Sequence, residues 1–243
     1  KYGRAFADSY HEMYQPKQAV HDIEKIEAAL EQGRVEVDLY RPYNAGGREV
    51  SLKIFSPNKP VSLSDVLPIL ENMGLKVVAE YPHHVRPQGG GDIWIQDFLA
   101  EVDGKVATEP DKKSVHAVRE QFEACLKGIW AGQIENDSLN KLILLSAMTW
   151  RDIVILRSCV RYLRQTKIPF SLSYMEQALT ENPHIAMVFG QLFHSLFNPQ
   201  MQGKKSQTAA LREMVLDALQ EVSSIDQDRI LRAILCLMDA ALR

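Results

Sequence analysis

The spacing of apolar residues in the first part of the chain predicts two helices followed by a pair of strands. Residues 16–32 carry apolar side chains every three or four positions, begin with proline and are followed by Gly33, which is typical of a helix. Residues 5–14 predict a shorter helix before it. Residues 35–40 and 50–55 alternate apolar and polar positions, so we expect two half-buried strands that pair as a hairpin.

From residue 50 onward, the predicted elements come in the order strand, helix, strand, strand, helix. They occupy residues 50–55, 62–73, 75–81, 93–102 and 114–131. This is the order of a ferredoxin-like split βαβ domain without its last strand, and residues 35–40 can supply the missing strand from earlier in the chain. The pattern therefore predicts an α+β domain with four strands and two helices on one face.

The rest of the chain carries only helical periodicity, divided by capping residues. Eleven of the 13 glycines and eight of the 11 prolines lie at or before Gly132, so the later sequence is poor in turns. Helix starts are indicated at Asn136 or Asp137, Thr149, Ser171 or Ser173, Asn182 and Ser224. Five or six helices with short loops predict a compact bundle.

These patterns divide the chain into three parts. We expect N-terminal helices in residues 1–33, the ferredoxin-like domain in residues 34–132 and an all-helical bundle in residues 133–243. The N-terminal helices are expected to pack on the ferredoxin-like domain.

Composition and charge narrow the functional classes. Apolar residues make up 46% and charged residues 24%, which excludes intrinsic disorder, a collagen-like repeat and a small disulfide scaffold. A net charge of −3 and a pI near 6.2 argue against a dedicated nucleic-acid binder. No stretch approaches the ~20 apolar residues of a membrane span.

The cysteines and the chain ends add two expectations. Cys125, Cys159 and Cys236 are widely spaced and form no C-x-x-C pair, which predicts reduced, mostly buried thiols in a cytoplasmic protein. The chain opens on Lys1 and closes at Arg243 within a helical pattern, so we expect a piece of a longer protein.

A search for short catalytic motifs finds none, so we predict no catalytic, cofactor-binding or metal-ligating residue. The sequence lacks G-x-G-x-x-G, the phosphate-binding loop, H-E-x-x-H and G-x-S-x-G. His83 and His84 are adjacent on a predicted strand and point to opposite faces, which disfavours one shared metal. Asp92, Asp97 and Glu101 could perform acid–base chemistry, but their setting favours a solvated strand face.

Three arginines form a row on one predicted helix. Arg157, Arg161 and Arg164 recur at helical spacing beside an apolar stripe. Such a row can hold phosphate or nucleic acid, but the second half is nearly neutral, which favours contacts with acidic groups on a neighbouring domain. Trp94, Trp130 and Trp150 are interpreted as core residues.

Residues 54–77 resemble the first strand, loop, helix and second strand of an ACT domain, a ferredoxin-like module that commonly binds amino acids and pairs side by side. More specifically, the chain resembles part of the large bacterial NAD-specific glutamate dehydrogenases. The segments that carry this likeness include residues 39–42, 63–74, 94–98, 145–165, 168–171 and 229–243.

The resemblance implies that this piece lies just before the catalytic region, so no catalytic residue is carried over. The whole protein is then expected to oxidise L-glutamate to 2-oxoglutarate and ammonia in the cytoplasm with NAD as its cofactor, while this piece binds none. Its implied partners are the catalytic domain of the same chain and further copies in a homo-oligomer, with neither nucleic acid nor membrane.

The ACT likeness also implies an effector site at Asn58, Lys59 and Ser62. Amino-acid-binding ACT domains usually have a glycine in this loop, where backbone N–H groups meet the ligand, whereas Val61 and Ser62 occupy it here.

Three hypotheses follow. The leading one is a non-catalytic regulatory or assembly region, in which an edge strand of the ACT-like sheet offers backbone groups for self-association and the bundle braces the catalytic domain. The alternative is a stand-alone ACT-like module that senses amino acids or binds a protein. The third is a self-contained enzyme that uses Asp92, Asp97 or the two histidines.

Overall fold

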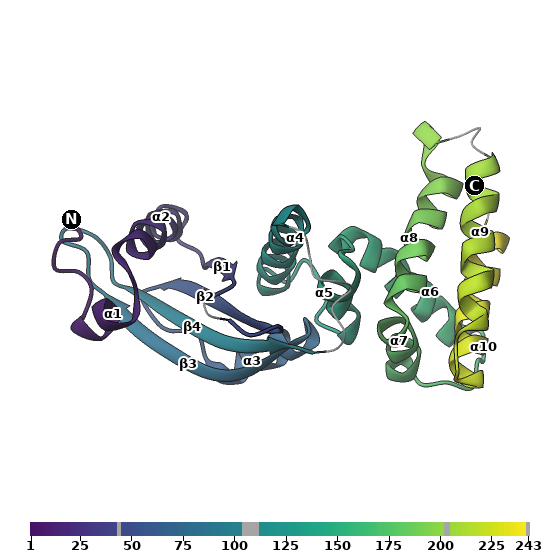
Figure 1. The fold of residues 1–243 in the computed structure, drawn as a ribbon, viewed down its shortest axis with the longest axis horizontal. Helices are drawn as coiled ribbons and strands as arrows, with labels where there is room; N and C mark the ends of the chain where they lie inside the picture. The colour runs from purple at the N-terminus through teal and green to yellow at the C-terminus, as the bar shows by residue number, and fades with distance from the viewer. Residues whose placement is uncertain (43–44, 104–111, 202–204, 242–243) are drawn as a thin grey trace. The chain divides into compact units, whose positions relative to one another are not determined.

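The computed structural model describes residues 1–42, 45–103, 112–201 and 205–241 of the chain (Figure 1). The chain divides into two compact units, one made of residues 1–104 and 122–136 and the other of residues 105–121 and 137–243. The first unit holds the N-terminal helices together with the sheet, and the three-part division at residues 33 and 132 stays a prediction.

The first unit contains the predicted alternation of helices and strands. Its elements are α1 (Asp8–Met13), α2 (Pro16–Gln32), β1 (Glu36–Tyr40), β2 (Glu49–Pro57), α3 (Leu63–Asn72), β3 (Leu75–Val85), β4 (Ile93–Val102) and the later part of α4 (Lys112–Trp130). The helix α2 ends where predicted because Gly33 adopts the left-handed conformation, with φ of 62°.

The four strands form one antiparallel sheet in the order β1-β2-β4-β3. Since β4 lies between β2 and β3 and runs opposite to both, β2, α3, β3 and β4 make the split βαβ arrangement. The early strand β1 pairs with the outer edge of β2, where it supplies the fourth strand. The predicted α+β, ferredoxin-like fold is therefore confirmed.

Apolar side chains from the N-terminal helices and the sheet form one core. Its buried members are Ala5, Phe6, Tyr10, Ile26, Ala29, Phe55, Val85, Ile93 and Ile95. Phe55 of β2 lies opposite Ile95 of β4, so the two strands present apolar residues to the helices on one face. The alternate residues Leu52 and Ile54 are fully buried as well, which shows that the centre of the sheet is covered on both faces.

The strand β1 differs from its prediction as a half-buried strand. Glu36, Val37, Asp38 and Leu39 are all buried, although their side chains alternate between the two faces. The helix α2 lies over β1 and β2 (Figure 1), so it covers the polar face that the sequence pattern assigned to solvent.

The second unit is helical throughout its described residues. It contains η1 (Ser138–Lys141), α5 (Leu142–Ser146), α6 (Trp150–Gln165), α7 (Leu172–Glu181), α8 (Pro183–Phe197), η2 (Pro199–Met201), α9 (Lys205–Gln220) and α10 (Ile225–Ala240). The single helix expected over residues 139–147 is instead a 3-10 turn followed by α5. The reason is local: Asp137 caps the 3-10 turn, and Ala147 ends α5 in the left-handed conformation.

Most of the predicted caps are present. Thr149 and Asp152 form a reciprocal capping box at α6, and Ser171 and Ser224 accept backbone hydrogen bonds at α7 and α10. Asn182 precedes Pro183 as expected but makes no capping bond to α8. None of the helices within the described residues is long and apolar enough to cross a membrane.

Candidate functional site

Two oppositely charged residues, Lys53 and Asp97, lie buried at the centre of the sheet. They are direct cross-strand partners on β2 and β4, and only 1% and 3% of their surfaces are exposed. They share the face that Phe55 and Ile95 present to the N-terminal helices, because residues two apart on a strand point the same way. A charged pair at this position must find its partners inside the protein.

The helix α2 supplies the anion for Lys53. The Lys53 ammonium donates to Asp22 Oδ2 at 2.6 Å, and the Tyr10 hydroxyl donates to the same oxygen at 2.5 Å. The ammonium also lies 3.8 Å from the ring centre of Tyr14, a favourable cation–π distance. Pro16 and the Gln15–Gln18 capping box fix the start of α2 and thereby place Asp22 above the sheet.

Two tyrosines hold Asp97. The hydroxyls of Tyr14 and Tyr40 each donate to Asp97 Oδ2 at 2.6 Å, whereas Asp97 Oδ1 has no hydrogen-bond partner among the described residues. Burial raises the pKa of Asp97, and the two hydroxyls and the Lys53 charge act against that rise. The expectation of a solvated strand face is wrong for Asp97, because α1 and α2 cover it.

His83 completes the buried cluster. It is 5% exposed, and its ring meets the rings of Tyr10 and Tyr14 edge-on at 5.4 and 5.5 Å between centroids. Neither ring nitrogen has a hydrogen-bond partner within the described part of the chain. Burial lowers the pKa of His83, which favours a neutral ring.

The neighbouring histidine faces the other way, as the strand pattern predicted. His84 is only partly buried, stacks on Trp94 at 4.3 Å and lies 3.0 Å from Asp92 Oδ2. No group of three or more potential metal ligands occurs among the residues that the structure describes. Trp94 is therefore a stacking partner at the surface of the sheet and not a fully buried core residue.

The outer edge of β1 is also occupied. The Lys25 ammonium donates to the Val37 carbonyl at 2.8 Å, the Leu39 N–H donates to Glu123 Oε1 at 3.1 Å, and Lys25 and Glu123 lie 3.5 Å apart. Side chains of α2 and α4 thus take backbone groups that an added strand would use. These two backbone groups of β1 are therefore not available for the self-association through an edge strand that the leading hypothesis includes.

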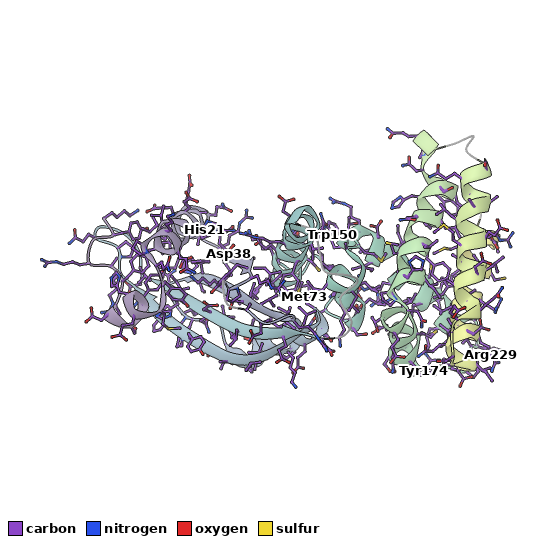
Figure 2. All side chains as sticks on the ribbon, in the orientation of Figure 1. His21, Asp38, Met73, Trp150, Tyr174 and Arg229 are labelled. Carbon is purple, nitrogen blue, oxygen red and sulfur yellow. The ribbon has the colours of Figure 1, made fainter. Side chains whose placement is uncertain are left out.

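A further polar contact joins α2 to the polar face of β1. His21 Nε2 lies 3.3 Å from Asp38 Oδ2, and Figure 2 labels both side chains where α2 meets β1. Lys127 of α4 pairs with the buried Glu36 of the same strand. The polar residues of β1 are therefore engaged by the helices around them.

The residues buried between the N-terminal helices and the sheet include groups that could perform acid–base chemistry. We call this cluster the buried polar network: Tyr10, Tyr14, Asp22, Tyr40, Lys53, His83 and Asp97. Burial and the nearby carboxylates raise the pKa values of Tyr10, Tyr14 and Tyr40, so their hydroxyls stay protonated donors. The tyrosine hydroxyls and the Lys53 ammonium already occupy Asp22 Oδ2 and Asp97 Oδ2, while Asp97 Oδ1 and the His83 ring nitrogens have no hydrogen-bond partner among the described residues. The arrangement is suited to holding the helices on the sheet.

The predicted effector residues lie on the loop between β2 and α3. Asn58 adopts a left-handed conformation, with φ of 67°, and its N–H donates to the Asp92 carbonyl. Ser62 precedes α3 without capping it, and its hydroxyl bonds that of Ser64 at 2.6 Å. Lys59 is exposed.

A buried amide holds the centre of that loop. Gln96 accepts from the Val61 N–H at 2.6 Å and donates to the Val61 carbonyl and to Glu80. The Val61 N–H, in the loop where the ACT likeness implies a ligand, is therefore already bonded. Effector binding at Asn58, Lys59 and Ser62 stays a prediction.

The three arginines of α6 do not share one environment. Arg157 is buried and donates to Asp137 Oδ1 at 2.9 Å and to Asn140 at 3.0 Å, both within the second unit. Arg161 and Arg164 are exposed. The helical unit itself engages Arg157, and a role of Arg161 and Arg164 between domains stays a prediction.

Sequence reasoning did not single out five members of the buried polar network: Tyr10, Tyr14, Asp22, Tyr40 and Lys53. The sequence does contain one indication for Lys53: it lies two residues before Phe55 on the same strand, so both side chains point to the same face of the sheet. The positions of Tyr10, Tyr14 and Asp22 over that face depend on how α1 and α2 pack, which periodicity does not specify.

Three family models match successive parts of the chain. Their descriptions are glutamate dehydrogenase, helical motif 2 for residues 1–29, glutamate dehydrogenase, ACT3 domain for residues 34–113, and glutamate dehydrogenase, helical motif 3 for residues 134–199. The chain belongs to the glutamate dehydrogenase family. The buried polar network thus joins helical motif 2, which carries Tyr10, Tyr14 and Asp22, to the ACT3 domain.

Curated relatives support the same assignment over nearly the whole chain. An NAD-specific glutamate dehydrogenase of Pseudomonas aeruginosa is 33% identical over 99% of the chain, and one of Mycobacterium tuberculosis is 32% identical over 100%. One of Halomonas elongata is 33% identical over 98%. The chain spans only about 15% of the length of these relatives.

Proposed function

We propose that the chain is a non-catalytic regulatory or assembly region of an NAD-specific glutamate dehydrogenase. The whole protein would oxidatively deaminate L-glutamate to 2-oxoglutarate and ammonia while reducing NAD in the cytoplasm. Family membership supports the reaction, and the modules matched here are an ACT3 domain and two helical motifs. The partners would be the catalytic region of the same longer chain and other copies of the protein.

The closed buried polar network is the observation that carries the non-catalytic role. Asp97 and His83, two residues of the self-contained enzyme hypothesis, lie beneath α1 and α2, and Asp97 is held by tyrosine hydroxyls. The hydrogen bond from Tyr14 to Asp97 and the ring contacts of His83 attach helical motif 2 to the ACT3 sheet. The other two, Asp92 and His84, bond each other beside Trp94.

The test compares the 243-residue chain with the longer protein captured from its source by an antibody to this region. We expect a captured chain several times heavier than 27.5 kDa that reduces NAD with L-glutamate, and no turnover by the isolated chain. As a control, the variants Asp97→Asn and His84→Phe are introduced into the isolated 243-residue chain. Turnover by the isolated chain, abolished by either variant, would refute the non-catalytic role.

A further inference from the structure

The helical unit carries a groove with an apolar floor and an acidic rim. The groove, of about 670 Å³, lies between the start of α8 and the end of α9, and its lining includes Glu181, Ile185, Met214, Asp217, Glu221 and Val222. Clefts of roughly 300–1,000 Å³ hold a drug-sized molecule, so this one has room for a few side chains and not for a whole helix.

The apolar floor follows from the spacing of residues along α9. Met214, Ala218 and Val222 recur every four positions, so they lie on one side of the helix and its C-terminal extension. Asp217 and Glu221 follow the same spacing one position earlier and flank that row. Neither of these two carboxylates has a hydrogen bond or ion pair among the described residues.

The same unit presents a basic helix face with the opposite character. On α6, Arg151, Val154, Ser158, Arg161 and Tyr162 share the exposed side, opposite the buried stripe that includes Leu156 and Val160. Val154 and Tyr162 are 40% and 53% exposed, so both side chains are accessible on this face. Exposed tyrosine and arginine side chains are the residue types that most often dominate protein–protein binding.

We propose that the outer face of α6 docks into the acidic groove of a second copy of this chain, with Tyr162 and Val154 entering between α8 and α9. This inference rests on the assembly role proposed above. The arginines at 151 and 161 would then face the carboxylates at 217 and 221. The small side chain of Ser158 allows close approach between the two apolar residues.

This contact joins two different surfaces, so it is a head-to-tail association. Each copy keeps one unused groove and one unused helix face, and growth continues unless the rotation closes a ring. The floor is small, so the association of the isolated chain is expected to be weak and to depend on salt.

The test is sedimentation of the 243-residue chain at increasing concentration, up to about 1 mM. We expect the mean mass to rise with concentration beyond that of a dimer, and to fall at about 1 M salt. The variants Asp217→Lys/Glu221→Lys and Arg151→Glu/Arg161→Glu, each alone, are expected to weaken association about tenfold or more. Circular dichroism checks that both variants remain folded.

Mixing the two variants provides the matched control. Each carries one reversed surface, so the mixture offers two attractive contacts, one between the two unchanged surfaces and one between the two reversed surfaces. The mixture should therefore associate although neither variant does alone. A wild-type chain that stays monomeric refutes the docking and leaves the non-catalytic role untouched. Association that is indifferent to all four substitutions also refutes the docking, while the assembly role then stands on another surface.

Discussion

Replacing Asp22 by asparagine tests whether the buried polar network holds helical motif 2 on the ACT3 sheet. The substitution keeps the shape and an acceptor for Tyr10 but removes the charge that lies 2.6 Å from the Lys53 ammonium. Removing one partner of a buried ion pair costs about 3–5 kcal/mol, because the other charge is left uncompensated. The Tyr14 ring still offers cation–π stabilisation, so we expect about 3 kcal/mol, the lower end of that range.

That loss is a large share of the total stability of a domain, which is about 5–15 kcal/mol. The assay is urea unfolding of the 243-residue chain, followed by far-ultraviolet circular dichroism and tyrosine fluorescence. Because the chain has two compact units, the curves are fitted as two transitions, and only the transition of the first unit should move.

Two further variants make the result decisive. Asp228→Asn removes an anion from the exposed pair with Arg232 and should cost less than about 1 kcal/mol. Asp22→Asn combined with Lys53→Met removes both charges of this pair and should recover part of the loss, because no unpaired ammonium remains, while Asp97 also loses the favourable Lys53 charge. Equal losses for Asp22→Asn and Asp228→Asn, or no recovery in the double variant, would refute the reasoning.

Three other predictions follow from the first unit. The pKa of His83 is lowered in the folded state, so the stability that its neutral ring contributes is complete above the unfolded pKa of about 6.5 and is lost as the pH falls toward the folded pKa. The variant His83→Phe should therefore lose less stability than the wild type between about pH 7 and pH 5, as measured by urea unfolding. Glu123→Ala should destabilise the unit by about 1–3 kcal/mol by leaving the Leu39 N–H without its acceptor, whereas Glu123→Gln should be nearly neutral; equal effects would contradict the role of the acceptor. Calorimetry with millimolar L-glutamate should give heat that Lys59→Ala and Ser62→Ala remove if the effector site exists, and no heat rejects that site.

The elements with one clear period could be predicted from the sequence, and the buried polar network could not. The helix over residues 16–32 and the strand over residues 93–102 have the predicted bounds, because proline and glycine mark the ends of the first and the glycine cluster at residues 89–91 precedes the second. Alternation alone cannot distinguish solvent from a covering helix. Asp97 was therefore interpreted as solvated although tyrosines from two other elements bury it.

The predicted helix over residues 139–147 shows a second limit. Most of its residues are apolar, so the pattern favours one helix, but the capping bond of Asp137 closes a 3-10 turn first. Arg157 then binds the same Asp137, which removes one arginine from the predicted surface row. Hydrogen bonds of Asp137 determine both the 3-10 turn and the burial of Arg157, and the pattern of apolar and polar residues does not predict such bonds.

Helical motif 2 and the ACT3 domain lie in one compact unit although separate family models describe them. Their shared core needs Ile26 and Ala29 from the helices as much as Ile95 from the sheet. Charge makes the dependence stronger, since Lys53 of the sheet has its hydrogen-bonded anion on α2. An ACT3 domain cut free at residue 34 would expose or leave unpaired a buried ammonium, and that is a large cost. Any change that loosens α2 from the sheet therefore also removes the hydrogen-bonded anion of Lys53.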